Sequence, residues 1–139
     1  MLLEILIGIG LAAICVLLVK TIFKDKEIPF WRTGLLAAAI VYVVLGLIGQ
    51  GWGFIGVDLI GVVLYGALAW ASRKNLIWLP LGWALHILWD VLVHPAGHPG
   101  YVPNWYPGVC LGFDILVAGY LGWLIFKLQE NNHISSSPS

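Results

Sequence analysis

Long apolar stretches, separated by short polar or glycine-rich breaks, run almost to the end of the chain. A membrane-spanning helix needs about 20 apolar residues, and this length divides the sequence into five predicted helices. They cover residues 2–23, 34–49, 54–72, 76–94 and 107–128. The pattern therefore predicts an all-α fold, a polytopic membrane helix bundle that forms one transmembrane domain over residues 1–128. We expect the polar residues 129–139 to be a disordered tail.

The apolar stretch over residues 34–72 requires a turn near its middle. As a single helix it would extend about 60 Å, at about 1.5 Å per residue, which is twice the hydrocarbon thickness of a bilayer. The segment Gln50-Gly51-Trp52-Gly53 suits this turn, because its glycines permit a tight backbone and Gln50 is favourable at a membrane interface. We therefore expect two antiparallel helices, one on each side of this segment.

The ends of the last two helices carry recognisable signals. Asn75 is a suitable N-cap ahead of the fourth helix, and Pro95 disfavours helical backbone after His94. The loop beyond is rich in proline and glycine as far as Pro107, which suits the first turn of the fifth helix.

Composition identifies lipid as the main solvent of the chain. Of the 139 residues, 60% are hydrophobic and 10% are charged, which leaves too little polar surface for a water-soluble domain of this size. The formal net charge is zero and no basic run occurs, so the chain lacks the positive surface that nucleic-acid binding requires. We therefore expect membrane lipid as a partner, and no nucleic acid.

The positive charges predict an orientation, because short cytoplasmic loops collect lysine and arginine. All the basic residues fall near the first predicted loop, in the third loop or at the end of the last helix. They are Lys20, Lys24, Lys26, Arg32, Arg73, Lys74 and Lys127. The predicted topology therefore has the N-terminus outside and the C-terminus inside, in a multi-pass protein of the cell (inner) membrane.

Four acidic residues fall within the predicted spans, all in the half away from the positive charges. They are Glu4, Asp58, Asp90 and Asp114. An ionised carboxylate in lipid costs at least about 2.5 kcal/mol, so such residues normally face the bundle interior and find partners there. Their similar depth predicts one shared polar pocket.

The most specific local pattern lies in the fourth predicted helix, where His86, Asp90 and His94 are spaced four residues apart. This spacing places the three side chains on one helix face, within about 80°. Imidazole and carboxylate are ligands of zinc, iron and manganese. We therefore predict that these residues hold a divalent metal, with zinc or iron favoured.

Three further residues complete the candidate site. His98 follows His94 at the same interval but lies in the proline-rich loop, so it is either another metal ligand or a solvated loop residue. Asp114 and Asp58 are the candidate catalytic residues, as a general base or an additional ligand. The same side chains could instead form a metal-free hydrogen-bond or proton-carrying network, and the spacing does not distinguish the two.

The stretch from Gly82 to Tyr120, which contains HILWD, HPAGHPG and NWYPGVCLGFD, resembles a family of short bacterial integral-membrane proteins of unknown function. In ligand types alone, the chain is also similar to membrane-embedded metal-dependent hydrolases of the ceramidase and adiponectin-receptor type. Those proteins hold zinc with histidines and an aspartate among their helices. This chain has five predicted helices instead of seven and lacks their serine-x3-histidine element, so the resemblance assigns no residue role.

Three functional hypotheses follow. The first is a membrane metalloprotein, a hydrolase or an oxidoreductase, that acts on a lipid or another small apolar substrate entering from the outer leaflet. The second is a proton- or cation-coupled transport unit, in which paired subunits of a homo-oligomer complete the path. The third is a non-catalytic membrane assembly subunit whose polar residues fix helix packing.

Overall fold

The computed structural model of the chain describes residues 1–94 and 101–135, with side chains as far as residue 131. The described part is all-α and contains five α-helices, as predicted. In chain order they are α1 (Leu2–Ile22), α2 (Glu27–Ile48), α3 (Ile55–Ala71), α4 (Trp78–Leu92) and α5 (Tyr106–Ser135), and the short 3-10 helix η1 (Lys24–Lys26) joins α1 to α2.

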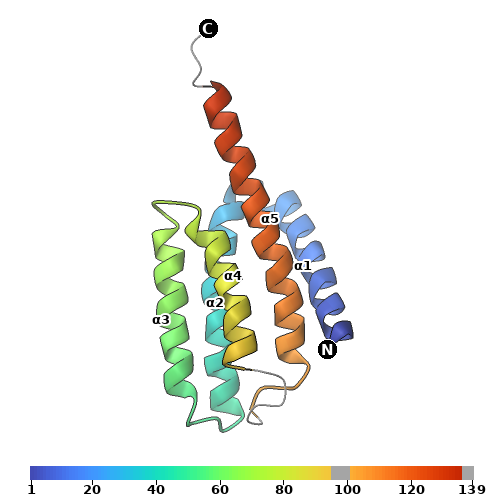
Figure 1. Ribbon diagram of the computed structural model, residues 1–139, viewed down its shortest axis with the longest axis vertical. Helices are drawn as coiled ribbons and strands as arrows, with labels where there is room; N and C mark the ends of the chain where they lie inside the picture. Colours follow the sequence, from blue (N-terminus) through green and yellow to red (C-terminus); the bar gives the residue numbers. More distant parts are fainter. Residues whose placement is uncertain (95–100, 136–139) are drawn as a thin grey trace.

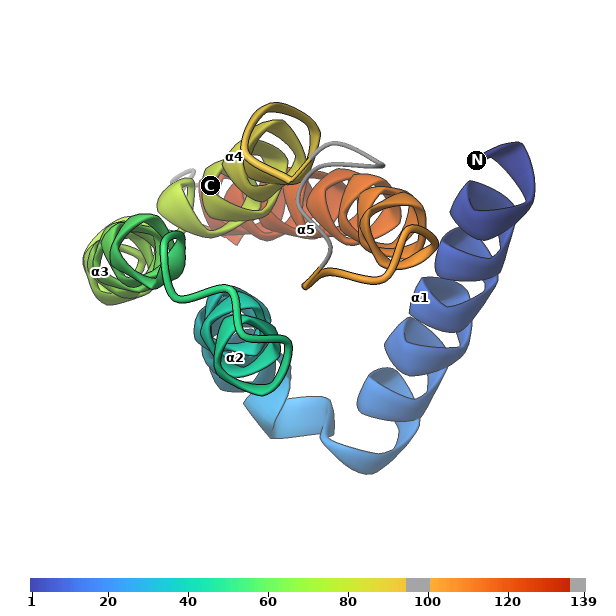
Figure 2. The same ribbon diagram turned by 90° about the horizontal axis from the view of Figure 1, so that it is seen from below.

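The helices run alternately up and down and form an antiparallel bundle (Figure 1). α1 packs along α5, α5 packs along α4, and α2 packs along α3. Viewed from the end, α1 and α2 meet at η1 and diverge from there (Figure 2). The backbones of α2 and α5 also stay apart over the described residues. α1 is therefore held to the bundle mainly by α5.

Three helices are long and apolar enough to cross a membrane, by length and composition: α1, α2 together with η1, and α5. α3 and α4 contain 17 and 15 residues. They extend about 26 and 22 Å, against a hydrocarbon thickness of about 30 Å. Large apolar side chains cover the outer faces of the helices, including Val63 and Leu92, each 73% exposed. Because such surface is unfavourable in water, the fold is compatible with a membrane protein.

Two helices are longer than the sequence pattern predicts. α2 begins at Glu27 instead of residue 34, because Pro29 falls in its first turn, where proline fits a helix. α5 continues to Ser135 instead of ending at residue 128, because no proline or glycine occurs between residues 129 and 135 to end the helix. Residues 129–135 are therefore helical where a disordered tail is expected from the sequence, and residues 136–139 lie outside the described residues.

The turn between α2 and α3 lies where the sequence predicts it. Gln50 adopts left-handed backbone with φ of 59°, and the N–H of Gly51 donates to the carbonyl of Gly46 at 2.8 Å. Gly49 and Gly51 both lie against Tyr101, since a Cβ added at either glycine would come within 2.7 Å of the Tyr101 side chain. The two glycines therefore make room for Tyr101 beside the end of α2.

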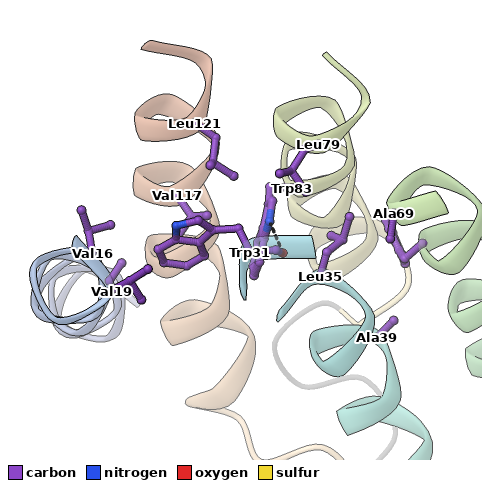
Figure 3. Packing of buried hydrophobic residues seen from close by; sticks show 12 residues of the cluster. Val16, Val19, Trp31, Leu35, Ala39, Ala69, Leu79, Trp83, Val117 and Leu121 are labelled. Carbon is purple, nitrogen blue, oxygen red and sulfur yellow. Dashed lines mark hydrogen bonds between the residues drawn. The ribbon is translucent and has the colours of Figure 1, made fainter. Parts of the chain in front are cut away.

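An apolar core fills the bundle from its middle toward the end where α1 and α3 finish (Figure 3). Trp31 and Trp83 meet edge to face with ring centroids 6.0 Å apart, and the indole N–H of Trp83 donates to the Trp31 carbonyl at 3.3 Å. Leu79 of α4 and Leu121 of α5 are fully buried in this core. The core therefore joins α2, α4 and α5, although the backbones of α2 and α5 stay apart.

Two glycines allow α1 and α5 to approach closely. A Cβ added to Gly8 of α1 would overlap the carbonyl oxygen of Val109, and one added to Gly112 of α5 would overlap the carbonyl oxygen of Ile5. Small residues permit such backbone-to-backbone packing between helices in membrane proteins. These contacts fix α1 against the first half of α5.

The lysines and arginines lie on segments that meet at one end of the bundle (Figure 1). These segments are the connection from α1 to α2, the connection from α3 to α4, and the later part of α5. The ammonium of Lys20, near the end of α1, lies 5.0 Å from the ring centroid of Tyr120 in α5. The basic residues thus gather at the end of the bundle opposite to the beginnings of α3 and α5.

Candidate functional site

Two ionisable residues of α4 face the bundle interior and meet an acid of α5. His86 and Asp90 are about one helical turn apart and each is 1% exposed, and Asp114 is 2% exposed. The imidazole Nδ1 of His86 lies 2.7 Å from Asp114 Oδ2 and 3.6 Å from Asp90 Oδ1. We call these three residues the His86 cluster.

The geometry of the His86 cluster allows its residues to share one ion. One ligand atom from each residue, an imidazole nitrogen or a carboxylate oxygen, lies within 4.8 Å of the other two. This set of donors suits zinc, iron or manganese. A divalent cation would also offset the cost of keeping two carboxylates in a low-dielectric interior. The donor chemistry therefore fits the kind of metal that the sequence predicts.

Two buried atoms of the cluster, His86 Nε2 and Asp90 Oδ2, have no hydrogen-bond partner in the described part of the chain. Buried polar atoms are normally hydrogen-bonded, so both mark places where a ligand, a proton or a water molecule would be stabilised. The protonation of the imidazole Nδ1 determines which contacts His86 can make. Without a proton, Nδ1 can bind an ion beside the carboxylates. With a proton, Nδ1 donates to Asp114 and leaves the lone pair of Nε2 free.

Tyr42 of α2 holds Asp90 in place from the other side. Its buried hydroxyl donates to Asp90 Oδ1 at 2.6 Å, and outer hydrogen bonds of this kind fix the orientation of ligating carboxylates. Tyr42 is a site residue that the sequence pattern alone did not identify. The signal that could have found it is a phenol in the middle of an apolar helix, where the hydroxyl needs a partner.

A second cluster forms just beyond the end of α4. His94 Nε2 lies 2.8 Å from Asp58 Oδ1, and the Tyr101 hydroxyl donates to Asp58 Oδ2 at 3.1 Å and lies 3.3 Å from His94 Nδ1. All three side chains are buried, and we call them the His94 cluster. Burial, and after it the charge of Asp58, raises the pKa of the Tyr101 phenol. The phenol therefore remains a hydrogen-bond donor well above neutral pH.

The structure divides the predicted metal ligands between the two clusters. His86 and Asp90 combine with an acid of α5, whereas His94 pairs with an acid of α3. Residues eight positions apart on a helix are separated by about 12 Å along its axis, and α4 ends at Leu92, so His94 leaves the helix. Among the described residues, the donors close enough to share one ion are those of His86, Asp90 and Asp114, and the expected common set of His86, Asp90 and His94 is not brought together. His98, the fourth predicted ligand, lies outside the described residues.

The buried acids are distributed in the same way. Of the two predicted catalytic residues, Asp114 belongs to the His86 cluster and Asp58 to the His94 cluster. Glu4 belongs to neither cluster and pairs with the N-terminal ammonium of Met1. The single polar pocket expected from the sequence is therefore two clusters.

An apolar cavity of about 280 Å³ adjoins the His86 cluster, between α1, α2, α4 and α5. His86 and Asp114 form part of its wall, and apolar and aromatic side chains such as Trp31 and Phe113 form much of the remainder. A second cavity, of about 210 Å³, reaches Asp90 from the side of the first turn of α1. The cluster therefore lines a space that an apolar ligand could enter.

Comparison with known proteins provides a family and no activity. A family model described as "Family of unknown function (DUF6010)" matches residues 3–127, a region that contains both clusters. No curated protein and no solved structure matches the chain.

Proposed function

The chain belongs to the DUF6010 family of unknown function, and we propose that it is a multi-pass membrane enzyme that binds a divalent cation in the His86 cluster. The observation that supports this proposal is the convergence of one imidazole and two carboxylates, all buried, beside an apolar cavity. Zinc or iron is the ion that these donors favour. The cavity suits a lipid or another small apolar molecule as the substrate.

Each residue of the cluster has a role in this proposal. His86 and Asp90 hold the ion together with Asp114, and Tyr42 keeps Asp90 oriented. A bound divalent ion supplies Lewis acidity and lowers the pKa of coordinated water. Asp114, on the wall of the cavity, is also placed to accept a proton as a general base. Hydrolysis is the reaction class that these residues provide without a further cofactor.

We place the His86 cluster in the outer half of the cell membrane, with the N-terminus outside and the C-terminus inside. The gathering of basic residues at the opposite end of the bundle supports this orientation, because cytoplasmic segments collect them. In this arrangement all five helices cross the bilayer, which thins locally beside the shorter α3 and α4. The substrate enters from the side, between α1 and α2, where these helices diverge.

A metal-free proton-carrying network in a transport unit is the second candidate. It is favoured by Tyr42, which contacts His94 through its ring and Asp90 through its hydroxyl, so that one side chain joins the two clusters. The apolar core around Trp31 and Trp83 argues against a polar path through the whole chain, because it fills the other half of the described bundle. We therefore prefer the enzyme.

Elemental analysis of the protein, purified in mild detergent without chelator and offered zinc, iron and manganese in turn, tests the proposal. We expect stoichiometric metal in the unmodified protein and its loss in Asp114→Asn. Asp58→Asn is the matched control, because it changes a buried aspartate of the other cluster, and it should retain the metal. A folded protein that binds none of the three ions would overturn the proposal. Equal loss in both variants would overturn the assignment to the His86 cluster.

A further inference from the structure

A small cavity of about 200 Å³ lies between α2 and α3, at the end of the bundle where the basic residues gather. Two arginines line it: Arg32 comes from the second turn of α2, and Arg73 follows the end of α3. The rest of the lining is largely apolar and includes Leu36 and Trp70. The cavity is remote from both histidine clusters, so the inference drawn from it does not depend on the proposed enzymatic function.

The guanidinium of Arg32 is held in a fixed position by Ser72 at the end of α3. Its Nε donates to Ser72 Oγ at 2.8 Å, and its Nη2 donates to the Ser72 carbonyl at 3.2 Å. Ser72 is fully buried, and its own hydroxyl donates to the carbonyl of Ala69 at 2.7 Å. A guanidinium has five N–H donors in a planar fork, so these two contacts leave others available to a ligand.

The second guanidinium is positioned by an aromatic ring. Arg73 lies over the Trp70 indole, with its guanidinium carbon 4.6 Å from the ring centroid. Within the described residues, neither Arg32 nor Arg73 forms an ion pair with a carboxylate. Two like charges that face one partly buried cavity repel each other, and an anion between them would remove this cost.

We propose that this cavity binds a phosphate group, that of an anionic phospholipid headgroup at the inner surface of the membrane. Guanidinium forks match the geometry of phosphate oxygens, and basic pockets between membrane helices on the cytoplasmic side bind such headgroups. Leu36 and Trp70, which is 64% exposed, provide apolar surface beside the arginines. A lipid would use this surface for its glycerol and acyl chains, whereas free phosphate would not.

Native mass spectrometry of the detergent-purified full chain tests this site. The protein is offered equal amounts of phosphatidylglycerol and phosphatidylcholine, and in a separate arm inorganic phosphate alone. We expect retention of phosphatidylglycerol over phosphatidylcholine by about tenfold, the effect of one charge-assisted contact. Arg73→Gln should remove this preference. Lys74→Gln is the matched control, because it removes the neighbouring exposed charge, which does not line the cavity, and it should keep the preference.

Each other outcome counts against part of the proposal. Equal retention of the two lipids, or equal losses in Arg73→Gln and Lys74→Gln, would overturn a specific site. Inorganic phosphate that binds with the same dependence on Arg73, without a preference among lipids, would make a soluble anion the ligand and overturn the lipid. Arg32→Gln removes the contacts with Ser72 and can unfold the chain. Arg32→Lys is therefore the better variant, because it keeps the positive charge and removes the planar guanidinium fork. We expect this variant to weaken lipid retention while the protein stays folded.

Discussion

The ring of Tyr42 stacks on the imidazole of His94, with ring centroids 4.1 Å apart and planes inclined by 7°. The hydroxyl of the same tyrosine donates to Asp90 in the His86 cluster. One side chain of α2 therefore contacts both clusters, with its face on one and its polar tip on the other. Mutation can separate the two contacts, because phenylalanine keeps the ring and loses the hydroxyl.

Tyr42→Phe should weaken metal binding while leaving the stack on His94 intact. Loss of the hydrogen bond frees Asp90, and removal of such an outer contact lowers metal affinity on the order of 10- to 100-fold. Metal affinity is measured by competition with a chromophoric chelator in detergent. Tyr65→Phe is the control, because the Tyr65 hydroxyl donates to the Leu85 carbonyl at 3.1 Å and to no carboxylate of the cluster. A similar loss in both variants would contradict the role of Tyr42.

His86 of α4 and His94, just beyond its end, should have different effects when each is replaced by alanine. His86→Ala removes the only imidazole of the His86 cluster and should abolish stoichiometric metal. His94→Ala should retain the metal and lower the melting temperature, because it leaves the buried Asp58 without its histidine. Elemental analysis and thermal unfolding in detergent measure the two effects. Loss of metal in both variants would favour the single site with His86, Asp90 and His94 as common ligands.

Filling the apolar cavity should block the substrate and spare the metal. Ala38 lines the cavity between α1 and α2, so Ala38→Phe places a ring in the space where we expect an apolar ligand. Binding of a fluorescent fatty-acid probe should weaken by about tenfold or more, with unchanged metal content. Ala37→Phe adds the same ring at the adjacent exposed position and should bind the probe normally. Equal binding by both variants would place the substrate elsewhere.

The close contact between α1 and α5 predicts a strong effect of a single methyl group. A Cβ at Gly112 would overlap the carbonyl oxygen of Ile5, so Gly112→Ala should destabilise the protein by about 1–3 kcal/mol, as overpacking does. Gly119→Ala is the control on the same helix, because its added Cβ meets no heavy atom within 4 Å. Thermal unfolding in detergent compares the two. A melting temperature of Gly112→Ala equal to that of the control would show that α1 is free to move away from α5.

The helices could be predicted from the sequence because each is a nearly continuous apolar run that ends at a local helix-breaking or turn signal. The turn at Gln50 and Gly51 was predicted correctly, since two helices of bilayer length cannot fit without it. Asn75 is not the N-cap expected from the sequence. α4 begins at Trp78 with Ile77 as its N-cap, and the Asn75 side chain accepts from the N–H of Ile77 at 3.1 Å in the turn before the helix. The beginning of α2 was not predicted, because the polar residues near Arg32 are typical of a loop. The sequence does not reveal that the Arg32 guanidinium is hydrogen-bonded to Ser72 at the end of α3.

The partners within the candidate site could be predicted only in part. Depth alone indicated that the acids and histidines lie in the same half of the bundle, and they do meet there. Which acid faces which histidine depends on the rotation of neighbouring helices, and the period of α4 contains no information on that rotation. The Tyr42 hydroxyl is separated from Asp90 by 48 positions in the sequence, so no local pattern connects them.

The packing of α1 on α5 has a consequence for biosynthesis. α5 emerges from the ribosome after α2, α3 and α4, so α1 lacks its principal neighbour until α5 has been made. The same delay applies to the His86 cluster, because Asp114 is the last of its three residues to be translated. A nascent chain that stops before α5 would carry only two of the three residues of the His86 cluster. If the cluster binds the proposed metal, the metal is therefore expected to enter only after translation of α5, when the helices have assembled.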